Sequence, residues 1–239
     1  MKTPSLASAF ALVLVGATGI ACGGSTANGG AGGGAQLTGH DTNPDGVPYP
    51  MPPGGYGRTP RSGSAPGSVM QNFKFLGYPD ADESKGLQTV GLADFYDPCN
   101  KRFKILHVTV AAAWCEPCNQ ETDAIVAAEA DLASKGVAVL QALDDGPVQG
   151  QPATVSDLDF WIADHKSNFT EVLDPGLQNF SGFFDAAAIP WNADLDVRTM
   201  EILDASVGWS GDVATELQPA HGALPGDPSY PLPAGLKCQ

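Results

Sequence analysis

Runs of apolar residues divide the middle of the chain into strands and helices. The run Ile105–Val110 is β-branched and uninterrupted, which predicts a strand buried on both faces. A helix is expected from Pro117, because apolar residues recur along one side of it, to Lys135, where Gly136 supplies a C-cap. A second buried strand, Val137–Leu143, follows at once. A strand, a helix and a strand with a short link predict a right-handed parallel unit.

Two hairpins are expected on either side of this unit. The segments Phe73–Tyr78 and Gln88–Val90 have the pattern of short strands separated by a polar turn. Farther along, apolar and polar residues alternate from Trp191 to Val197, and a tight turn leads to a strand at Glu201–Leu203. The chain therefore combines a parallel unit with antiparallel pairs.

Two further helices are expected between and after these elements. A Gly/Pro-rich interruption ends near Val155, and Ser156 with Asp159 resembles a capping box for a helix that carries Leu158 and Trp161. Residues 212–220 have the pattern of a last short helix, followed by a Pro-rich tail.

Residues 1–68 differ in composition from the rest of the chain and divide into two segments. Lys2 precedes a short apolar run from Leu6 to Ala21, which is shorter than the about 20 apolar residues of a membrane-spanning helix, so residues 1–21 are expected to be an export signal. The residues that end it, up to Cys22, resemble a bacterial lipobox; lipidation of Cys22 is expected, with plain secretion as the alternative. Residues 22–68 are rich in Gly, Pro, Ser and Asn and are expected to be a flexible tether, which leaves 69–239 as one domain.

The charge of the chain argues against a nucleic-acid partner. Lys and Arg number 12 and Asp and Glu number 27, for a formal net charge of −15. Removal of residues 1–21 would take away one lysine and no acidic residue and make the charge −16. A surface this acidic repels a phosphate backbone.

The segment Trp114–Cys118 stands where the first buried strand meets the helix, and it holds a Cys-x-x-Cys pair. Two thiols at this spacing can close a small disulfide ring, which indicates a reversible redox switch that needs no bound cofactor, because the pair itself carries two electrons. A cysteine at a helix start meets unpaired N–H groups and the positive end of the helix dipole, so we expect Cys115 to attack and Cys118 to resolve. Pro117 suits the first helical turn, whereas the charge of Glu116 opposes the dipole.

Two more cysteines, Cys99 and Cys238, remain after this pair and Cys22 are set aside. An oxidising compartment favours a bridge between them, worth about 4 to 5 kcal/mol in the chain-entropy model. Two unpaired thiols, or a bridge from Cys99 to the Cys-x-x-Cys pair, are equally compatible with the spacing.

The chain resembles the thioredoxin superfamily, and within it the TlpA/ResA-like, redoxin-related (AhpC/TSA-related) membrane-anchored thiol-disulfide oxidoreductases of bacteria. The resemblance covers about 73–220 and rests on Trp114–Cys118, on Glu121 three residues later, and on Ile189-Pro190 before the second hairpin. It implies an α/β, thioredoxin-like fold: a central mixed β-sheet flanked by helices, with an N-terminal β-hairpin extension. It also implies a cis bond before Pro190, the backbone of Ile189 as a contact for substrate, and supporting roles for Trp114 and Glu121.

Two residues depart from the family pattern. Thr109 stands six residues before Cys115, where the family has an acid or Asn, so the buried proton acceptor of thioredoxins is expected to be missing. Asp194 lies at an apolar position of the hairpin strand, which implies either poor cover of that sheet face or an unidentified partner. His107 is expected to be a satisfied core residue, and Glu121 could also be an ordinary acid on the helix surface.

The resemblance implies an exported, periplasm-facing enzyme, anchored to the membrane by lipid on Cys22, that exchanges disulfides with cysteine-containing exported proteins and a redox donor. A thiol peroxidase of related fold is one alternative, although Ala112 stands where its peroxidatic motif has Thr. A non-catalytic binding module with a structural disulfide is another. A metal site is not expected, since the four histidines lack metal-ligand spacing: His40, His107, His165 and His221.

Overall fold

The computed structural model describes residues 40–50, 66–185, 188–217 and 235–238. The expected export signal and Cys22 lie outside these residues. Within them, none of the helices combines the length and the apolar character that crossing a membrane requires.

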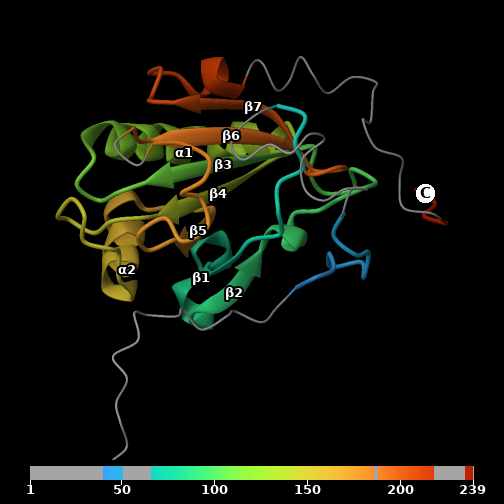
Figure 1. Ribbon diagram of the computed structural model, residues 1–239, viewed down its shortest axis with the longest axis horizontal. Helices are drawn as coiled ribbons and strands as arrows, with labels where there is room; N and C mark the ends of the chain where they lie inside the picture. Colours follow the sequence, from blue (N-terminus) through green and yellow to red (C-terminus); the bar gives the residue numbers. More distant parts are fainter. Residues whose placement is uncertain (1–39, 51–65, 186–187, 218–234, 239) are drawn as a thin grey trace, which may run out of the picture. The chain divides into compact units, whose positions relative to one another are not determined.

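A mixed seven-stranded sheet forms the centre of the domain (Figure 1). Its strand order is β2-β1-β5-β4-β3-β6-β7. The three central strands β5, β4 and β3 are parallel, and the outer strands pair antiparallel. The expected α/β fold with a central mixed sheet is therefore confirmed. The strands are β1 (Lys74–Tyr78), β2 (Gln88–Gly91), β3 (Ile105–Ala111), β4 (Val137–Leu143), β5 (Thr170–Leu173), β6 (Trp191–Asp196) and β7 (Glu201–Val207).

Helices α1 (Glu116–Ser134) and α2 (Val155–His165) connect the parallel strands. The expected parallel unit is confirmed, with Ile105 paired to Val137 at the start of β3 and β4. Gly136 adopts a φ of +81° directly after the α1 C-cap, as the sequence predicted.

The start of α2 differs from the prediction by two residues. The sequence contains two overlapping candidates for a capping box, and the box forms from Thr154 and Asp157 rather than from Ser156 and Asp159. Asp157 accepts from the backbone N–H of Thr154 at 2.8 Å, whereas Asp159 accepts a 2.8 Å hydrogen bond from the hydroxyl of Tyr78. Packing against β1 therefore decides between two boxes that are alike in sequence.

Residues of opposite parity on β3 belong to different parts of the core. Ile105 packs with Ile125 and Leu132 of α1, whereas Leu106 and Val108 pack in a cluster on the other face. The aromatic members of that second cluster include Phe75, Tyr96, Phe180 and Trp191. Because both faces are covered, every residue of β3 is buried.

The sequence analysis did not predict β5. This strand has four residues and carries a glutamate, Glu171, at a position that is fully buried between its neighbours. Both expected hairpins, by contrast, are present as β1–β2 and β6–β7. The N-terminal hairpin extension pairs with the parallel strands through β5.

The folded unit begins earlier than the expected boundary at Val69. Tyr49 lies in the core, and its hydroxyl donates to the carbonyl of Met70 at 2.9 Å. Asn43 is also buried and donates to the carbonyl of Tyr96 at 3.0 Å. Part of the segment expected to be a tether therefore packs on the domain, because it carries residues that can be buried with their polar groups satisfied.

The C-terminal end of the described chain is joined covalently to the domain. Cys99 and Cys238 form a disulfide across a sequence separation of 139 residues. Of the arrangements that the spacing left open, this is the one that the structure contains. A short helix also forms at 213–217, within the range expected for the last helix.

Candidate active site

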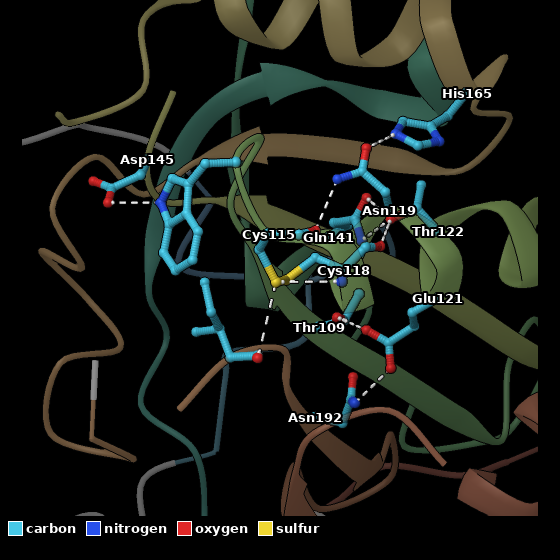
Figure 2. The surroundings of a disulfide bond; sticks show 12 residues. Thr109, Cys115, Cys118, Asn119, Glu121, Thr122, Gln141, Asp145, His165 and Asn192 are labelled. Atoms are coloured by element: carbon cyan, nitrogen blue, oxygen red, sulfur yellow. Dashed lines mark hydrogen bonds between the residues drawn. A yellow bond between two sulfur atoms is a disulfide. The ribbon is translucent and has the colours of Figure 1, made fainter. Parts of the chain in front are cut away.

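The Cys115–Cys118 pair lies at the junction of β3 and α1 and forms a disulfide (Figure 2). Cys115 is the N-cap of α1, and Cys118 belongs to its first turn. Cys118 is fully buried, whereas Cys115 retains 2 % of its surface. Of the two sulfur-bearing residues, only Cys115 therefore offers any surface to a partner.

The start of α1 provides the environment that a thiolate at Cys115 needs. The backbone N–H of Cys118 points to the Cys115 sulfur at 3.3 Å. Unpaired N–H groups at a helix start and the positive end of the helix dipole both favour an anion there. Pro117 occupies the first turn, where its missing N–H costs no hydrogen bond, and Glu116 is exposed and accepts from the side chain of Gln120 at 3.0 Å.

Glu121 is a buried acid one turn after Cys118. Its carboxylate accepts hydrogen bonds from the hydroxyl of Thr109 at 3.1 Å and from the side-chain amide of Asn192 at 2.7 Å (Figure 2). Burial raises the pKa of Glu121 to about 7, although a positive charge on His107 and the two hydrogen bonds act in the opposite direction. A carboxyl group that titrates near neutral pH can both accept and release a proton.

This arrangement corrects two expectations. Glu121 is fully buried, so the interpretation as a helix-surface acid is wrong. The expectation that Thr109 leaves the site without a buried proton acceptor is wrong as well, because the helix supplies the carboxyl group and Thr109 binds it. The spacing of Cys118 and Glu121 on α1, one turn apart, was the signal in the sequence that places both on the inward face.

Asp194 has a partner on the neighbouring strand. It faces His107 across β3 and β6, and the Nδ1 atom of His107 lies 2.8 Å from its carboxylate. Burial disfavours the imidazolium, but the hydrogen bond and charge of Asp194, with the charge of Glu121, raise the pKa of His107 above its usual value. The sheet face is therefore covered, and the polar residue in β6 is satisfied. His107 is a buried, hydrogen-bonded core residue, as the sequence predicted.

Neutral side chains form a hydrogen-bonded network that ends at the backbone carbonyl of Cys118. The hydroxyl of Thr122 donates to the carbonyl of Cys118 at 2.8 Å and accepts from the amide of Gln141 at 2.9 Å. The oxygen of that amide accepts from the indole N–H of Trp161 at 2.8 Å. The sequence analysis missed Thr122 and Gln141, because the contact between helix and strand that joins them has no local pattern.

Trp114 and Ile189 both pack against the apolar cluster that contains Cys115 and Cys118. The indole N–H of Trp114 donates to Asp145 at 3.1 Å. The carbonyl oxygen of Ile189 lies 3.9 Å from the sulfur of Cys115, and the Ile189–Pro190 bond is cis, as the resemblance implied. The structure thus brings the two distant segments that the sequence analysis named, 114–118 and 189–190, to one place.

No cluster of three or more His, Cys, Asp or Glu side chains with metal-binding geometry occurs among the residues that the structure describes. All side chains of the site described above belong to this described part of the chain.

Comparisons with known proteins bear on the fold. No protein-family model matches the sequence, and neither does any curated protein. A structure from Chlorobium tepidum, assigned as a thiol:disulfide interchange protein DsbE, is 21% identical, with 67% of this chain and 98% of that chain covered and a TM-score of 0.51. A Neisseria meningitidis protein assigned as a thioredoxin is 20% identical (68% and 95% covered, TM-score 0.49), and StoA from Bacillus subtilis is 17% identical (63% and 96% covered, TM-score 0.44).

The first of these likenesses covers 98% of the other chain and has a TM-score of 0.51. It shows that the chain has a thioredoxin-like fold, which is the fold that the resemblance implied.

Proposed function

We propose that the protein is an exported thiol-disulfide oxidoreductase that exchanges a disulfide between Cys115–Cys118 and cysteines of extracytoplasmic proteins. The observation that carries this proposal is the position of the Cys115 sulfur, at the N-cap of α1 and 3.3 Å from the N–H of Cys118. A sulfur in this position is stabilised as the thiolate, which is the form that attacks disulfides.

The exchange proceeds in two displacements. In the reduced protein the Cys115 thiolate attacks one sulfur of a client disulfide, and the other client sulfur leaves as a thiolate and takes a proton. Cys118 then loses its proton and attacks the Cys115 sulfur, which releases the second client thiolate. Two electrons pass to the client and the Cys115–Cys118 disulfide forms. Of the two protons that the client thiolates take up, one replaces the proton lost by Cys118 and the other comes from solvent, because Cys115 starts as the thiolate.

Glu121 is suited to the proton transfer in the second displacement. Cys118 is fully buried, so its thiol needs a nearby acceptor before it can attack. Glu121 lies one turn away on the same helix, with a pKa raised to about 7 by burial, and its protonation state can therefore change during turnover. The reverse reaction, oxidation of a client dithiol, would use the same group as the proton donor.

Substrate contact is assigned to the segment beside the disulfide. The Ile189 carbonyl lies next to the Cys115 sulfur, while the carbonyl of Pro190 accepts from the N–H of Gly208 at 2.8 Å and is occupied within the fold. An extended client segment can pair with the backbone of Ile189 and present its sulfur to Cys115. Trp114, held by its hydrogen bond to Asp145, packs against the same cluster as Ile189.

The location and the partners belong to the same proposal. An export signal at residues 1–21 and lipid on Cys22 would hold the domain at the periplasmic side of a bacterial membrane, where exported proteins with cysteines and a redox donor are its partners. The disulfide between Cys99 and Cys238 agrees with a compartment in which disulfides persist.

The test is reduction of insulin by dithiothreitol, together with the reduction potential of the Cys115–Cys118 pair. The protein is expected to accelerate insulin reduction, the Cys115→Ser variant is expected to be inactive, and the Cys99→Ser/Cys238→Ser variant is the matched control that keeps activity. A potential well below about −300 mV with no acceleration would instead identify a structural bridge. Consumption of peroxide in the same assay would favour the peroxidase alternative.

A further inference from the structure

His165, the last residue of α2, joins that helix to the first turns of α1 (Figure 2). Its side chain is 5% exposed and packs on Trp161, with ring centroids 4.2 Å apart. Its Nδ1 atom lies 2.7 Å from a carboxylate oxygen of Asp123, and its Nε2 atom lies 3.2 Å from the side-chain oxygen of Asn119. Both ring nitrogens therefore have partners, and both partners belong to α1.

The orientation of the Asn119 amide follows from its other contact. The side-chain nitrogen of Asn119 donates to the backbone carbonyl of Cys115 at 2.8 Å. A carbonyl oxygen only accepts, so the NH₂ group must face Cys115 and the amide oxygen must face His165. That oxygen is also only an acceptor, so the Nε2 atom of His165 must carry a hydrogen.

The second ring nitrogen is subject to the same argument. The Nδ1 atom faces the carboxylate of Asp123, which accepts, so this nitrogen must donate as well. Both nitrogens of an imidazole are donors only in the protonated, positively charged ring. Loss of one proton breaks either the contact with Asp123 or the contact with Asn119, and the second case frees the amide that binds the Cys115 carbonyl.

We propose that His165 is a positioning residue for the thiol-disulfide exchange at Cys115: in its protonated form it fixes Asn119 on the Cys115 carbonyl and places a positive charge against the first turns of α1, the helix whose N-cap is Cys115. The inference rests on the proposed function. Its physical basis is that a nearby cation stabilises an anion and that the N-cap geometry decides how well the Cys118 N–H meets the Cys115 sulfur.

The charged groups around His165 come from α1, from β5 and from the residue that follows α2. On α1, Asp123 contacts the ring, whereas the carboxylate of Glu121 is directed to Thr109 and Asn192. On β5, Glu171 and Leu173 are two residues apart and therefore face the same side of the sheet. Leu173 packs with residues of α2, so the buried carboxyl of Glu171 lies on the face that α2 covers. The exposed Lys166 follows His165 in the chain. Asp123 is the group among these whose contact with the ring requires the proton.

The first experiment measures the pH profile of Cys115 alkylation by iodoacetamide in the reduced full chain, with the labelled cysteine located by mass spectrometry. His165→Phe keeps a ring on Trp161 but removes the charge and both hydrogen bonds, and its midpoint is expected about one pH unit higher than that of the wild type. His165→Gln, which retains a neutral donor, is expected between the two. Asp164→Asn, at the exposed neighbouring position of α2, is the matched control and should leave the midpoint unchanged.

A second measurement keeps the inference testable if the variants fail to fold. In the wild-type chain labelled with ¹⁵N, both ring nitrogens of His165 are expected to show a directly bonded hydrogen under the conditions of the alkylation experiment. A ring nitrogen without a hydrogen, or a His165→Phe midpoint equal to that of the wild type, would overturn the proposal. Normal insulin reduction with an unchanged midpoint would refute this inference alone, whereas a shifted midpoint without insulin reduction would refute the proposed function alone.

Discussion

Asn192 on β6 donates a 2.7 Å hydrogen bond to Glu121 on α1, although the two residues are 71 positions apart in the chain. Asn192 follows the cis Ile189–Pro190 bond by two residues, so one short stretch of chain both faces the Cys115 sulfur and binds the buried acid. The Cys115 sulfur and the buried carboxyl of Glu121 are thus both contacted by one short stretch of chain, residues 189–192.

Replacement of Glu121 by Gln should slow exchange and remove its pH dependence near neutrality. The amide has almost the same shape but can neither take nor return a proton, and a positioned acid or base contributes about 10²-fold or more to a proton transfer. We expect insulin reduction to fall by about that factor, with the step near pH 7 lost, because burial raises the pKa of Glu121 to about 7. A variant that keeps the wild-type profile would exclude Glu121 from the proton transfer.

The stability of the fold should decrease between pH 5 and pH 8. Burial raises the pKa of Glu171 well above its ordinary value, that of Asp144 to about 6 and that of Asp174 in the same direction. An acid with a higher pKa in the folded chain holds its proton more tightly there, so its contribution is present at low pH and is lost as the pH rises through the folded pKa. The raised pKa of His107 acts in the same sense. Urea unfolding at the two pH values measures the difference.

Glu171→Gln should remove part of this pH dependence and stabilise the protein at pH 8. Glu171 is fully buried, neither of its carboxylate oxygens makes a well-formed hydrogen bond in the described part of the chain, and the weak interaction with Ser167 does not offset burial, so its charged form is costly. A neutral amide avoids that cost, and we expect a gain of about 1 to 3 kcal/mol at pH 8 and a smaller one at pH 5. An equal effect at both values would show that the charge of Glu171 is not the cause.

The His107–Asp194 pair should show strong coupling in unfolding experiments. His107→Phe removes the imidazole from a buried carboxylate, which is expected to cost about 3 to 5 kcal/mol. His107→Phe/Asp194→Leu replaces both partners by apolar groups and should recover most of that loss. Additive effects of the two single variants would contradict the account of Asp194 as a residue satisfied by His107.

Loss of the Cys99–Cys238 bridge should affect stability and leave the chemistry intact. In the chain-entropy model, a bridge that closes a loop with a separation of 139 residues contributes about 5 kcal/mol. The Cys99→Ser/Cys238→Ser variant should therefore unfold at lower urea concentration while it reduces insulin at the wild-type rate. A loss of activity in the folded variant would connect the bridge to the active site.

The elements with continuous local patterns could be predicted from the sequence, and those defined by packing could not. The run that forms β3 and the helix that follows it carry their own signals, and so do the alternating residues of β6. Strand β5 is short and contains Glu171, and its burial depends on strands on both sides. The same holds for Glu121: its spacing from Cys118 was visible, but the Thr109 and Asn192 contacts that bury it come from two other strands.

The central claim is that Cys115 is the attacking cysteine and that the buried Cys118 is the resolving cysteine. The reaction of single-cysteine variants with a chromogenic aromatic disulfide tests this claim most directly. Reduced Cys118→Ser should release the aromatic thiolate quickly at pH 7 and retain a mixed disulfide on Cys115, whereas reduced Cys115→Ser should react slowly through its fully buried Cys118. If Cys115 in the first variant reacts no faster than glutathione, or if Cys118 in the second reacts equally fast, the proposed mechanism is wrong.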